Sequence, residues 1–158
     1  MQNSDAVILR TLIQQQPIAT LATLHGGEPA ASMVPFVLAP GGAGFVIHIS
    51  RLASHSHDIQ AHPAVALLIT APLEQASTPL ALPRVSVQAV AQLCAVDSLD
   101  YAPARSAYLT RFPEAEELFS FSDFALFSIA PTSARFIAGF GRAMTLSPKQ
   151  LQEVVSAQ

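Results

Sequence analysis

Charged side chains are scarce in this sequence. They make up 12% of its 158 residues, and lysine occurs once, at Lys149. A typical globular chain has about 25% charged residues. A monomer with so few charges would expose much apolar surface, so we expect a partner subunit to cover part of it. The net charge of -3 and the scattered arginines exclude the basic surface typical of a nucleic-acid-binding protein.

Cysteines and long apolar runs are also lacking. Cys94 is the single cysteine, which excludes an intrachain disulfide and fits a reducing compartment. The first residues, MQNSDAVILRTLI, have no basic segment before their apolar one. No apolar run approaches the roughly 20 residues that span a bilayer. We therefore expect a cytoplasmic protein without a membrane-spanning segment.

Short segments with strand periodicity make up much of the chain. In residues 83–93, for example, Val85 and Val87 alternate with Arg84 and Ser86, which predicts one buried and one polar face. The predicted strands are residues 18–24, 30–39, 45–50, 64–71, 83–93, 123–130 and 133–140. The first three should form an antiparallel meander through the turns HGGEP and PGGAG.

Helices are predicted between and around these strands. Ser4 is positioned to cap a helix over residues 5–16, which Pro17 ends. Further short helices are expected in the segment 50–63, ending near His62, and at residues 100–111 and 113–119. Ser147 and Gln150 have the spacing of a capping box for a last helix. The proline-rich residues 72–83 are predicted to be a loop.

This pattern predicts a mainly β (α+β) protein. Six or seven short strands with turn residues between them favour an antiparallel β-barrel with short peripheral helices, formed by residues 1–158 as a single domain. A barrel of this size has room for little more than side chains inside. We therefore expect a sizeable ligand to bind outside the barrel or between subunits.

Three of the five histidines lie in the segment SRLASHSHDIQAHP, residues 50–63. On a helix, His55 and His57 point about 200° apart, and His55 and His62 are separated by about 10 Å along the axis. No pair can therefore share one metal ion, and no metal site is predicted. Two alternatives remain, a solvated helix and an anion site at the start of the helix.

The anion site follows from the position of the polar residues. Ser50, Arg51, Ser54, His55 and Ser56 fall at the end of a strand and in the first turn of the next helix. The N-H groups of a helix N-terminus and its positive potential favour an anion. Serine, arginine and histidine are suitable donors for a phosphate.

Four blocks of the sequence carry a resemblance to a known family. They are ATLATLHGGEPAASMVPF, HISRLASHSHDIQAHPAVALLIT, PRVSVQAVAQ and FIAGFGRA, which together cover about residues 17–145. In this order they resemble the pyridoxamine 5'-phosphate oxidase-like FMN-binding split-barrel superfamily, most of all its branch of haem-utilisation proteins. The resemblance implies a split β-barrel that forms a homodimer with FMN at the subunit interface.

The resemblance also implies roles for individual residues. Ser50, Leu52, Ser54, His55 and Ser56 fall in the block that binds the FMN phosphate. Arg51 lies within the same block. Ser32, Met33, Val34 and Pro35 fall on the strand whose backbone faces the flavin ring, and Arg84 occupies a flavin-contacting position. His55 alone of the clustered histidines would face the phosphate.

Several features differ from the true oxidases. Ser54 and His55 replace the arginine-lysine pair that binds phosphate in those enzymes, and the chain has no tryptophan. Oxidation of pyridoxamine phosphate is therefore not expected. The prediction is an FMN-dependent oxidoreductase acting on an unidentified small molecule, with the chemistry supplied by the flavin and no side chain identified as catalytic.

Two alternatives use the same fold. The first is a haem-binding protein, although no histidine follows His62 to serve as the late axial ligand that this branch would require. His25 or another exposed nitrogen then remains as an alternative ligand. The second is a dimeric interaction module without a cofactor.

Overall fold

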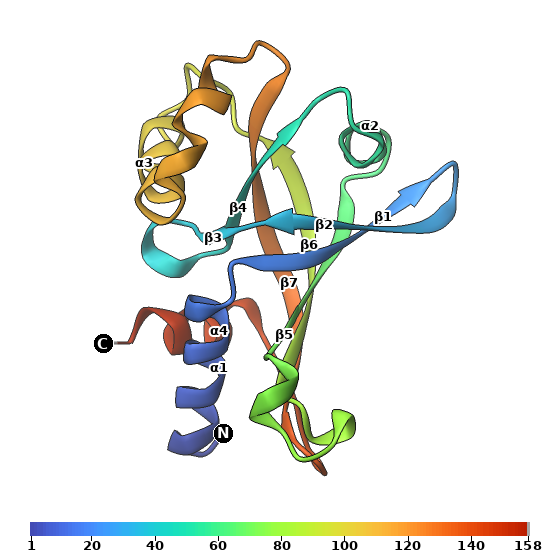
Figure 1. Ribbon diagram of the computed structural model, residues 1–158, viewed down its shortest axis with the longest axis vertical. Coiled ribbons are helices and arrows are strands. Elements are labelled where there is room, and N and C mark those ends of the chain that lie inside the picture. The colour runs from blue at the N-terminus through green and yellow to red at the C-terminus, as the bar shows by residue number, and fades with distance from the viewer. Residues whose placement is uncertain (158) are drawn as a thin grey trace.

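An antiparallel sheet that coils on itself forms the centre of the computed structural model, which describes residues 1–157 (Figure 1). The strands are β1 (Ile18–His25), β2 (Glu28–Pro35), β3 (Val37–Leu38), β4 (Phe45–Ser50), β5 (Ala64–Thr70), β6 (Arg84–Leu93), β7 (Phe124–Gly139) and β8 (Arg142–Leu146). Their order in the sheet is β2-β1-β5-β6-β7-β4-β3, and β8 pairs with β7. The predicted α+β, mainly β class is confirmed.

The two edge strands of the sheet are joined directly by the chain. β2 and β3 stand at opposite ends of the strand order, yet Phe36 alone separates them in the sequence. Phe36 is fully buried, and its ring packs edge-on against Phe45 at 5.7 Å between centroids. The predicted meander is present with a break at Phe36: β1 pairs with β2, and β3, the end of the predicted strand 30–39, pairs with β4. Within residues 1–157 no strand pairing joins β2 to β3, so the barrel is split there, as the family resemblance implies.

The longest strand joins two segments that the sequence analysis had separated. β7 runs without a break through Pro131 and Thr132, where two strands were predicted. A β-bulge allows this, because Gln88 pairs with Ser133 and Ala89 with Pro131, which leaves Thr132 as the extra residue. β8, which was not predicted, pairs with the second half of β7.

The helices pack around the sheet. They are α1 (Asn3–Gln15), α2 (Ser54–Ala61), α3 (Tyr101–Arg111) and α4 (Pro148–Ser156), with 3-10 turns η1 (Pro40–Gly42), η2 (Leu73–Gln75), η3 (Pro79–Ala81) and η4 (Pro113–Ser120). The capping box of Ser147 and Gln150 is confirmed at α4. The predicted cap by Ser4 is wrong, because α1 begins at Asn3, two residues earlier than predicted, and the N-cap position is Gln2. No helix within residues 1–157 is long and apolar enough to cross a bilayer.

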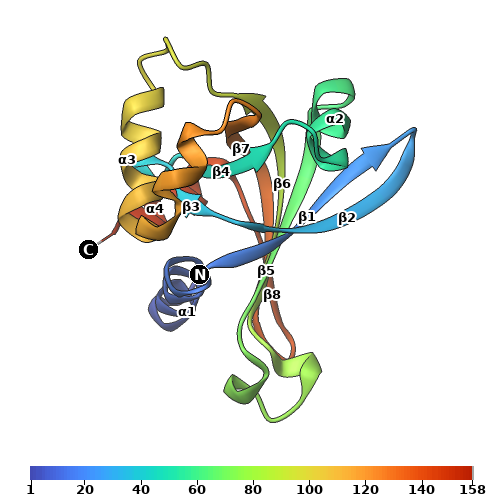
Figure 2. The same ribbon diagram turned by 45° about the horizontal axis from the view of Figure 1, so that its top comes forward.

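Two apolar clusters hold these layers together. The larger one lies between the sheet and the helices α1 and α4, where Leu9, Ile13 and Leu151 pack with Phe36 and Phe136. Figure 2 shows α1 and α4 on the same side of the sheet, away from α2. The smaller cluster joins α3 and η4 to β4 and contains Val46, Leu126 and Tyr108.

One side of the sheet is left uncovered by these helices, and we call it the open face. Its exposed apolar side chains come from β1, β2, β5 and β6 and are Ile18, Leu24, Met33, Leu68 and Val90. The pairing places Met33 beside Thr20, and Thr20 beside Leu68, in one row across the sheet. Side chains in such a row point to the same side. An apolar surface on four strands is therefore available to a partner.

Candidate functional site

A groove of about 270 Å³ lies between the start of α2 and the β1–β2 hairpin, and we call it the α2 groove. Its lining residues are Thr23, Ala30, Ala31, Ser32, Ser54, His55 and Asp58. Strand alternation places Thr23 in the groove, because the side chain of every second residue of β1 faces the inside of the protein. The inward positions are apolar at Ala19 and Leu21 but polar at Thr23, under α2.

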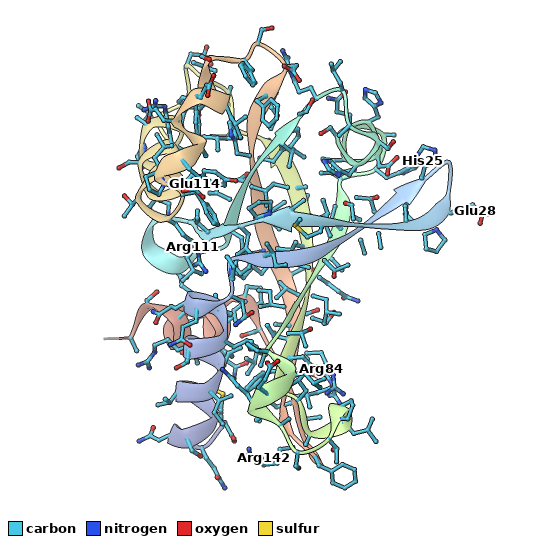
Figure 3. The ribbon with its side chains drawn as sticks, viewed as in Figure 1. His25, Glu28, Arg84, Arg111, Glu114 and Arg142 are labelled. Atoms are coloured by element: carbon cyan, nitrogen blue, oxygen red, sulfur yellow. The ribbon has the colours of Figure 1, made fainter. Side chains whose placement is uncertain are left out.

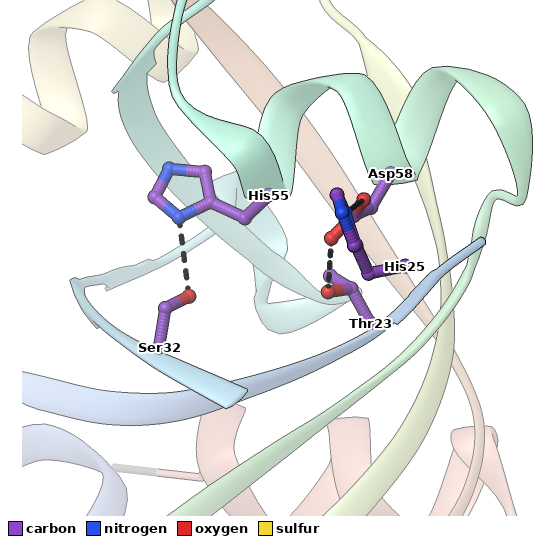
Figure 4. A network of polar contacts seen from close by, with 5 residues as sticks. All are labelled: Thr23, His25, Ser32, His55 and Asp58. Carbon is purple, nitrogen blue, oxygen red and sulfur yellow. Dashed lines mark hydrogen bonds and ion pairs between the residues drawn. The ribbon is translucent and has the colours of Figure 1, made fainter. Parts of the chain in front are cut away.

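Asp58 is the centre of a polar network in this groove (Figure 4). Its side chain is almost fully buried, and Thr23 donates a hydrogen bond to Oδ2 at 2.8 Å. The other oxygen, Oδ1, lies 2.7 Å from Nδ1 of His25. The hydrogen bond from Thr23, followed by the hydrogen bond and charge of His25, lowers the pKa of Asp58. Asp58 is therefore a carboxylate at neutral pH.

His55 lies at the other end of the same groove. Its Nδ1 is 3.1 Å from the hydroxyl oxygen of Ser32. Its Nε2 is shielded from solvent and has no hydrogen-bond partner within residues 1–157. Burial lowers the pKa of His55 and outweighs the opposing charge of Asp58. His55 is therefore predominantly neutral at neutral pH, which weakens it as a phosphate ligand.

Most donors of the predicted phosphate block already have partners within the chain. The Ser50 hydroxyl donates to the Asp123 carboxylate at 2.7 Å, and the fully buried Ser56 donates to the Ser50 carbonyl at 2.6 Å. The Arg51 guanidinium donates to the Ser122 carbonyl at 2.7 Å. Asp123 also places a negative charge beside the block. The backbone N–H of the exposed Leu52 donates to the Ser50 hydroxyl at 3.2 Å, and the Ser54 side chain is exposed without such a bond to other residues in 1–157.

The remaining predicted residues lie in two separate places. Ser32 lines the α2 groove, while Met33 points to the open face, Val34 is buried and Pro35 ends β2. Arg84 pairs with Thr70 at the far end of β5 and donates to the Leu82 carbonyl at 2.9 Å. Figure 3 shows Arg84 at the opposite end of the molecule from His25. One copy of the chain therefore does not bring Arg84 and the α2 groove together.

Sequence reasoning missed Thr23 and Asp58 as site residues, and it considered His25 only as an alternative haem ligand. Asp58 is separated from its two partners by 35 and 33 positions, so no local pattern links them. One signal was present, because Asp58 is the only acidic residue in the histidine-rich segment 50–63.

Comparison with known families matches residues 8–138 to the family described as pyridoxamine 5'-phosphate oxidase. That match covers most of the chain. The chain belongs to this family. The resemblance found from the four sequence blocks is thus confirmed.

Individual relatives place the chain near proteins named for haem. It is 29% identical to haem oxygenase HutZ of Vibrio cholerae over 144 residues, which is 90% of this chain and 81% of that protein. It is 33% identical to the chloroplastic haem oxygenase HOZ of Arabidopsis thaliana over 126 residues, 80% of this chain and 37% of that protein. A haem-binding protein from Mycobacterium smegmatis has a similar structure, with a TM-score of 0.85, 30% identity, and coverage of 97% of this chain and 62% of that one.

The residues of the site fit the two ligands of this fold differently. An FMN phosphate needs free donors, and in the phosphate block several of them are used within the chain, with Ser50 donating to the Asp123 carboxylate. Haem needs an axial ligand for its iron, which a histidine nitrogen can supply, and an apolar surface for the porphyrin. The chain supplies exposed imidazoles beside the α2 groove and an apolar open face. The donor set therefore suits haem better than a phosphate.

Proposed function

We propose that this protein binds haem at the interface of a homodimer. The observation that carries the proposal is the match to haem oxygenase HutZ, which extends over 90% of this chain and 81% of that protein. A match of this extent leaves little of either chain outside the comparison. A haem site at the α2 groove then replaces the roles that the family resemblance implied for FMN.

The chemistry of the groove supports haem over FMN. Asp123 accepts from Ser50 at 2.7 Å, so a dianionic phosphate in this position would meet a carboxylate. The porphyrin ring of haem is flat and apolar, and at a homodimer interface the open face of the second copy would supply apolar surface for it to cover. Haem carries the reactive iron, and the protein's residues bind and orient it and exclude water.

A titration with haemin tests this function. We expect a saturable shift of the Soret band in proportion to the protein, and much weaker uptake of FMN at the same concentrations. Adding a reductant under air to the haem complex should then cause the Soret band to decay, if the chain shares the activity for which HutZ is named. Folded protein that gives no saturable Soret shift would contradict the proposal.

A second candidate is an FMN-dependent oxidoreductase with an unidentified small-molecule substrate. It is favoured by one observation, the unpartnered Nε2 of His55 at the start of α2. In that case His55→Ala should weaken FMN binding roughly tenfold to hundredfold, because a hydrogen bond to a charged group contributes about 1.5 to 3 kcal/mol. His57→Ala should change it far less, because His57 is exposed on another side of α2.

Riboflavin provides the control for this second candidate. It lacks the phosphate, so the original protein and His55→Ala should bind it equally. Equal FMN affinity in both histidine variants would remove the phosphate role of His55. A stable dimer that takes up neither haem nor FMN would favour the interaction module without a cofactor.

A further inference from the structure

His25 differs from the other histidines in the way that its ring is held. It is the last residue of β1 and pairs with Glu28 across the β1–β2 turn. Gly26 and Gly27 form that turn with φ of 58° and 86°, values that side-chain-bearing residues rarely adopt. A tight two-residue turn fixes the end of the hairpin, so His25 stands on a strand and not on a loose loop.

The hydrogen bonds around Asp58 determine which nitrogen of His25 carries the proton. The carboxylate accepts from Thr23 at Oδ2 and contacts Nδ1 of His25 at Oδ1, at 2.7 Å (Figure 4). A carboxylate only accepts hydrogen bonds, so Nδ1 must be the donor. Nε2 of the neutral ring then keeps its lone pair. The His25 side chain is 67% exposed, while that of Asp58 is 5% exposed.

This arrangement is the one that orients metal-binding histidines. Such a histidine usually donates its second ring N-H to a carboxylate or carbonyl, which fixes the ring and makes the free nitrogen a better ligand. The ion pair of His25 with Asp58 is the only one within residues 1–157 that contains a histidine. Thr23 in turn fixes the carboxylate, so three residues from β1 and α2 act together.

The other histidines meet fewer of these requirements. His48 is buried, and its ring stacks on Phe119 at 3.8 Å between centroids. Nε2 of His55 is shielded from solvent. His57 and His62 are exposed, but neither forms an ion pair with a carboxylate within residues 1–157.

We propose that His25 is the axial ligand of the haem iron through Nε2, and that Asp58 and Thr23 are its positioning residues. The inference rests on the proposed function, since it needs a chain that binds haem. It gives this chain an iron ligand on the β1–β2 hairpin, although no histidine follows His62 in the sequence. The ligand would lie at the edge of the α2 groove that Thr23 and Asp58 line.

The first experiment compares His25→Gln with His57→Gln as haem complexes of the full chain. The ferrous complexes are examined by resonance Raman spectroscopy for the iron–histidine stretching band, and haemin affinity is measured by titration. We expect His25→Gln to lose the band and to bind haemin at least about tenfold more weakly, since loss of an outer partner alone typically costs 10- to 100-fold. The matched exposed variant His57→Gln should keep both properties.

The second experiment tests the positioning role with Asp58→Asn, which keeps the size of the side chain but removes its charge. The band should move to lower frequency, because an amide oxygen makes the His25 nitrogen a weaker donor of electrons to iron than a carboxylate does. A merely structural role of Asp58 would lower the thermal midpoint and leave the band in place. Circular dichroism of each variant without haem confirms that the fold is kept.

The outcomes separate this inference from the proposed function. If the original protein shows no saturable Soret shift, the haem function itself is wrong. If it binds haem and His25→Gln retains the band and the affinity, the assignment of His25 is overturned while the haem function stands. Loss of the band in His57→Gln instead would transfer the ligand to α2 and also overturn the assignment.

Discussion

The free energy of unfolding should fall by about 3 kcal/mol as the pH is lowered from 6.5 to 4, through one buried histidine. Burial, with a smaller contribution from the charge of Arg105, lowers the pKa of His48 from 6.5 to about 4. The unfolded chain takes up the proton first, below pH 6.5, while the folded protein resists it. The stability is therefore complete above pH 6.5 and decreases down to pH 4.

The surroundings of His48 give the physical reason. Its ring is 5% exposed and lies between aromatic rings, with Phe119 stacked at 3.8 Å and Tyr108 edge-on at 5.6 Å between centroids. Its Nδ1 is buried without a hydrogen-bond partner within residues 1–157. Arg105 lies over the Phe119 ring at 4.9 Å and pairs with Glu116. Burial, with a smaller contribution from Glu114, raises the pKa of Tyr108 to about 12, so Tyr108 stays neutral over this range.

The variant His48→Phe isolates this effect from the titration of the carboxyl groups. Phenylalanine keeps an aromatic ring against Phe119 and removes the nitrogen that titrates. Urea unfolding at pH 7, 6, 5 and 4 should show a stability loss on acidification that is smaller by about 3 kcal/mol than in the original protein. The exposed His57→Asn should keep the full pH dependence. Parallel curves for the original protein and His48→Phe would show that His48 is not responsible.

Replacing Leu68 with aspartate should dissociate the proposed homodimer. Leu68 lies on the open face in one row with Thr20 and Met33, and it is 40% exposed in the single chain. The two residues that pair directly with Leu68 are the uncharged Thr20 and Ser86, so a carboxylate buried there would have no cation directly beside it. The expected cost is about 3 kcal/mol or more, which weakens association roughly a hundredfold.

Sedimentation velocity at micromolar concentration measures this change. The original protein should sediment as a dimer, and Leu68→Asp should sediment mainly as a monomer. Val96→Asp is the matched control, because Val96 is 76% exposed in the segment that follows β6 and lies outside the open face. An original protein that is monomeric would remove the dimer, and an intact Leu68→Asp dimer would place the interface elsewhere.

Local patterns in the sequence predicted most of the elements. The alternation in residues 83–93 gave β6 within one residue, and the capping box gave the start of α4. Strand alternation and cap chemistry depend on neighbouring residues, which is why they can be read from the chain. Thr132 shows the limit, because Pro131 and Thr132 resemble a strand end unless a bulge opposite Gln88 accommodates them. β8 was missed, and its pairing with β7 is decided by that distant partner.

The candidate site was predicted only in outline. The resemblance indicated the region from Ser50 to Ser56 and the strand from Ser32 to Pro35, which do meet at the contact of Ser32 with His55. No local pattern indicated that Ser50 donates to Asp123, which is 73 positions away. It also did not indicate that Arg84 would be remote from the α2 groove in one chain.

The sequence by itself determined the mainly β class, the family and the scarcity of surface charge, because each of these depends on local pattern or on composition. The tertiary structure decided which polar groups remain available to a ligand. Ser50 and Ser56 are used within the chain, whereas His25 gains a buried carboxylate 33 positions away and keeps its exposed nitrogen free. A hydrogen-bonding group has few partners, and only the folded chain determines which of them lie within 3 Å.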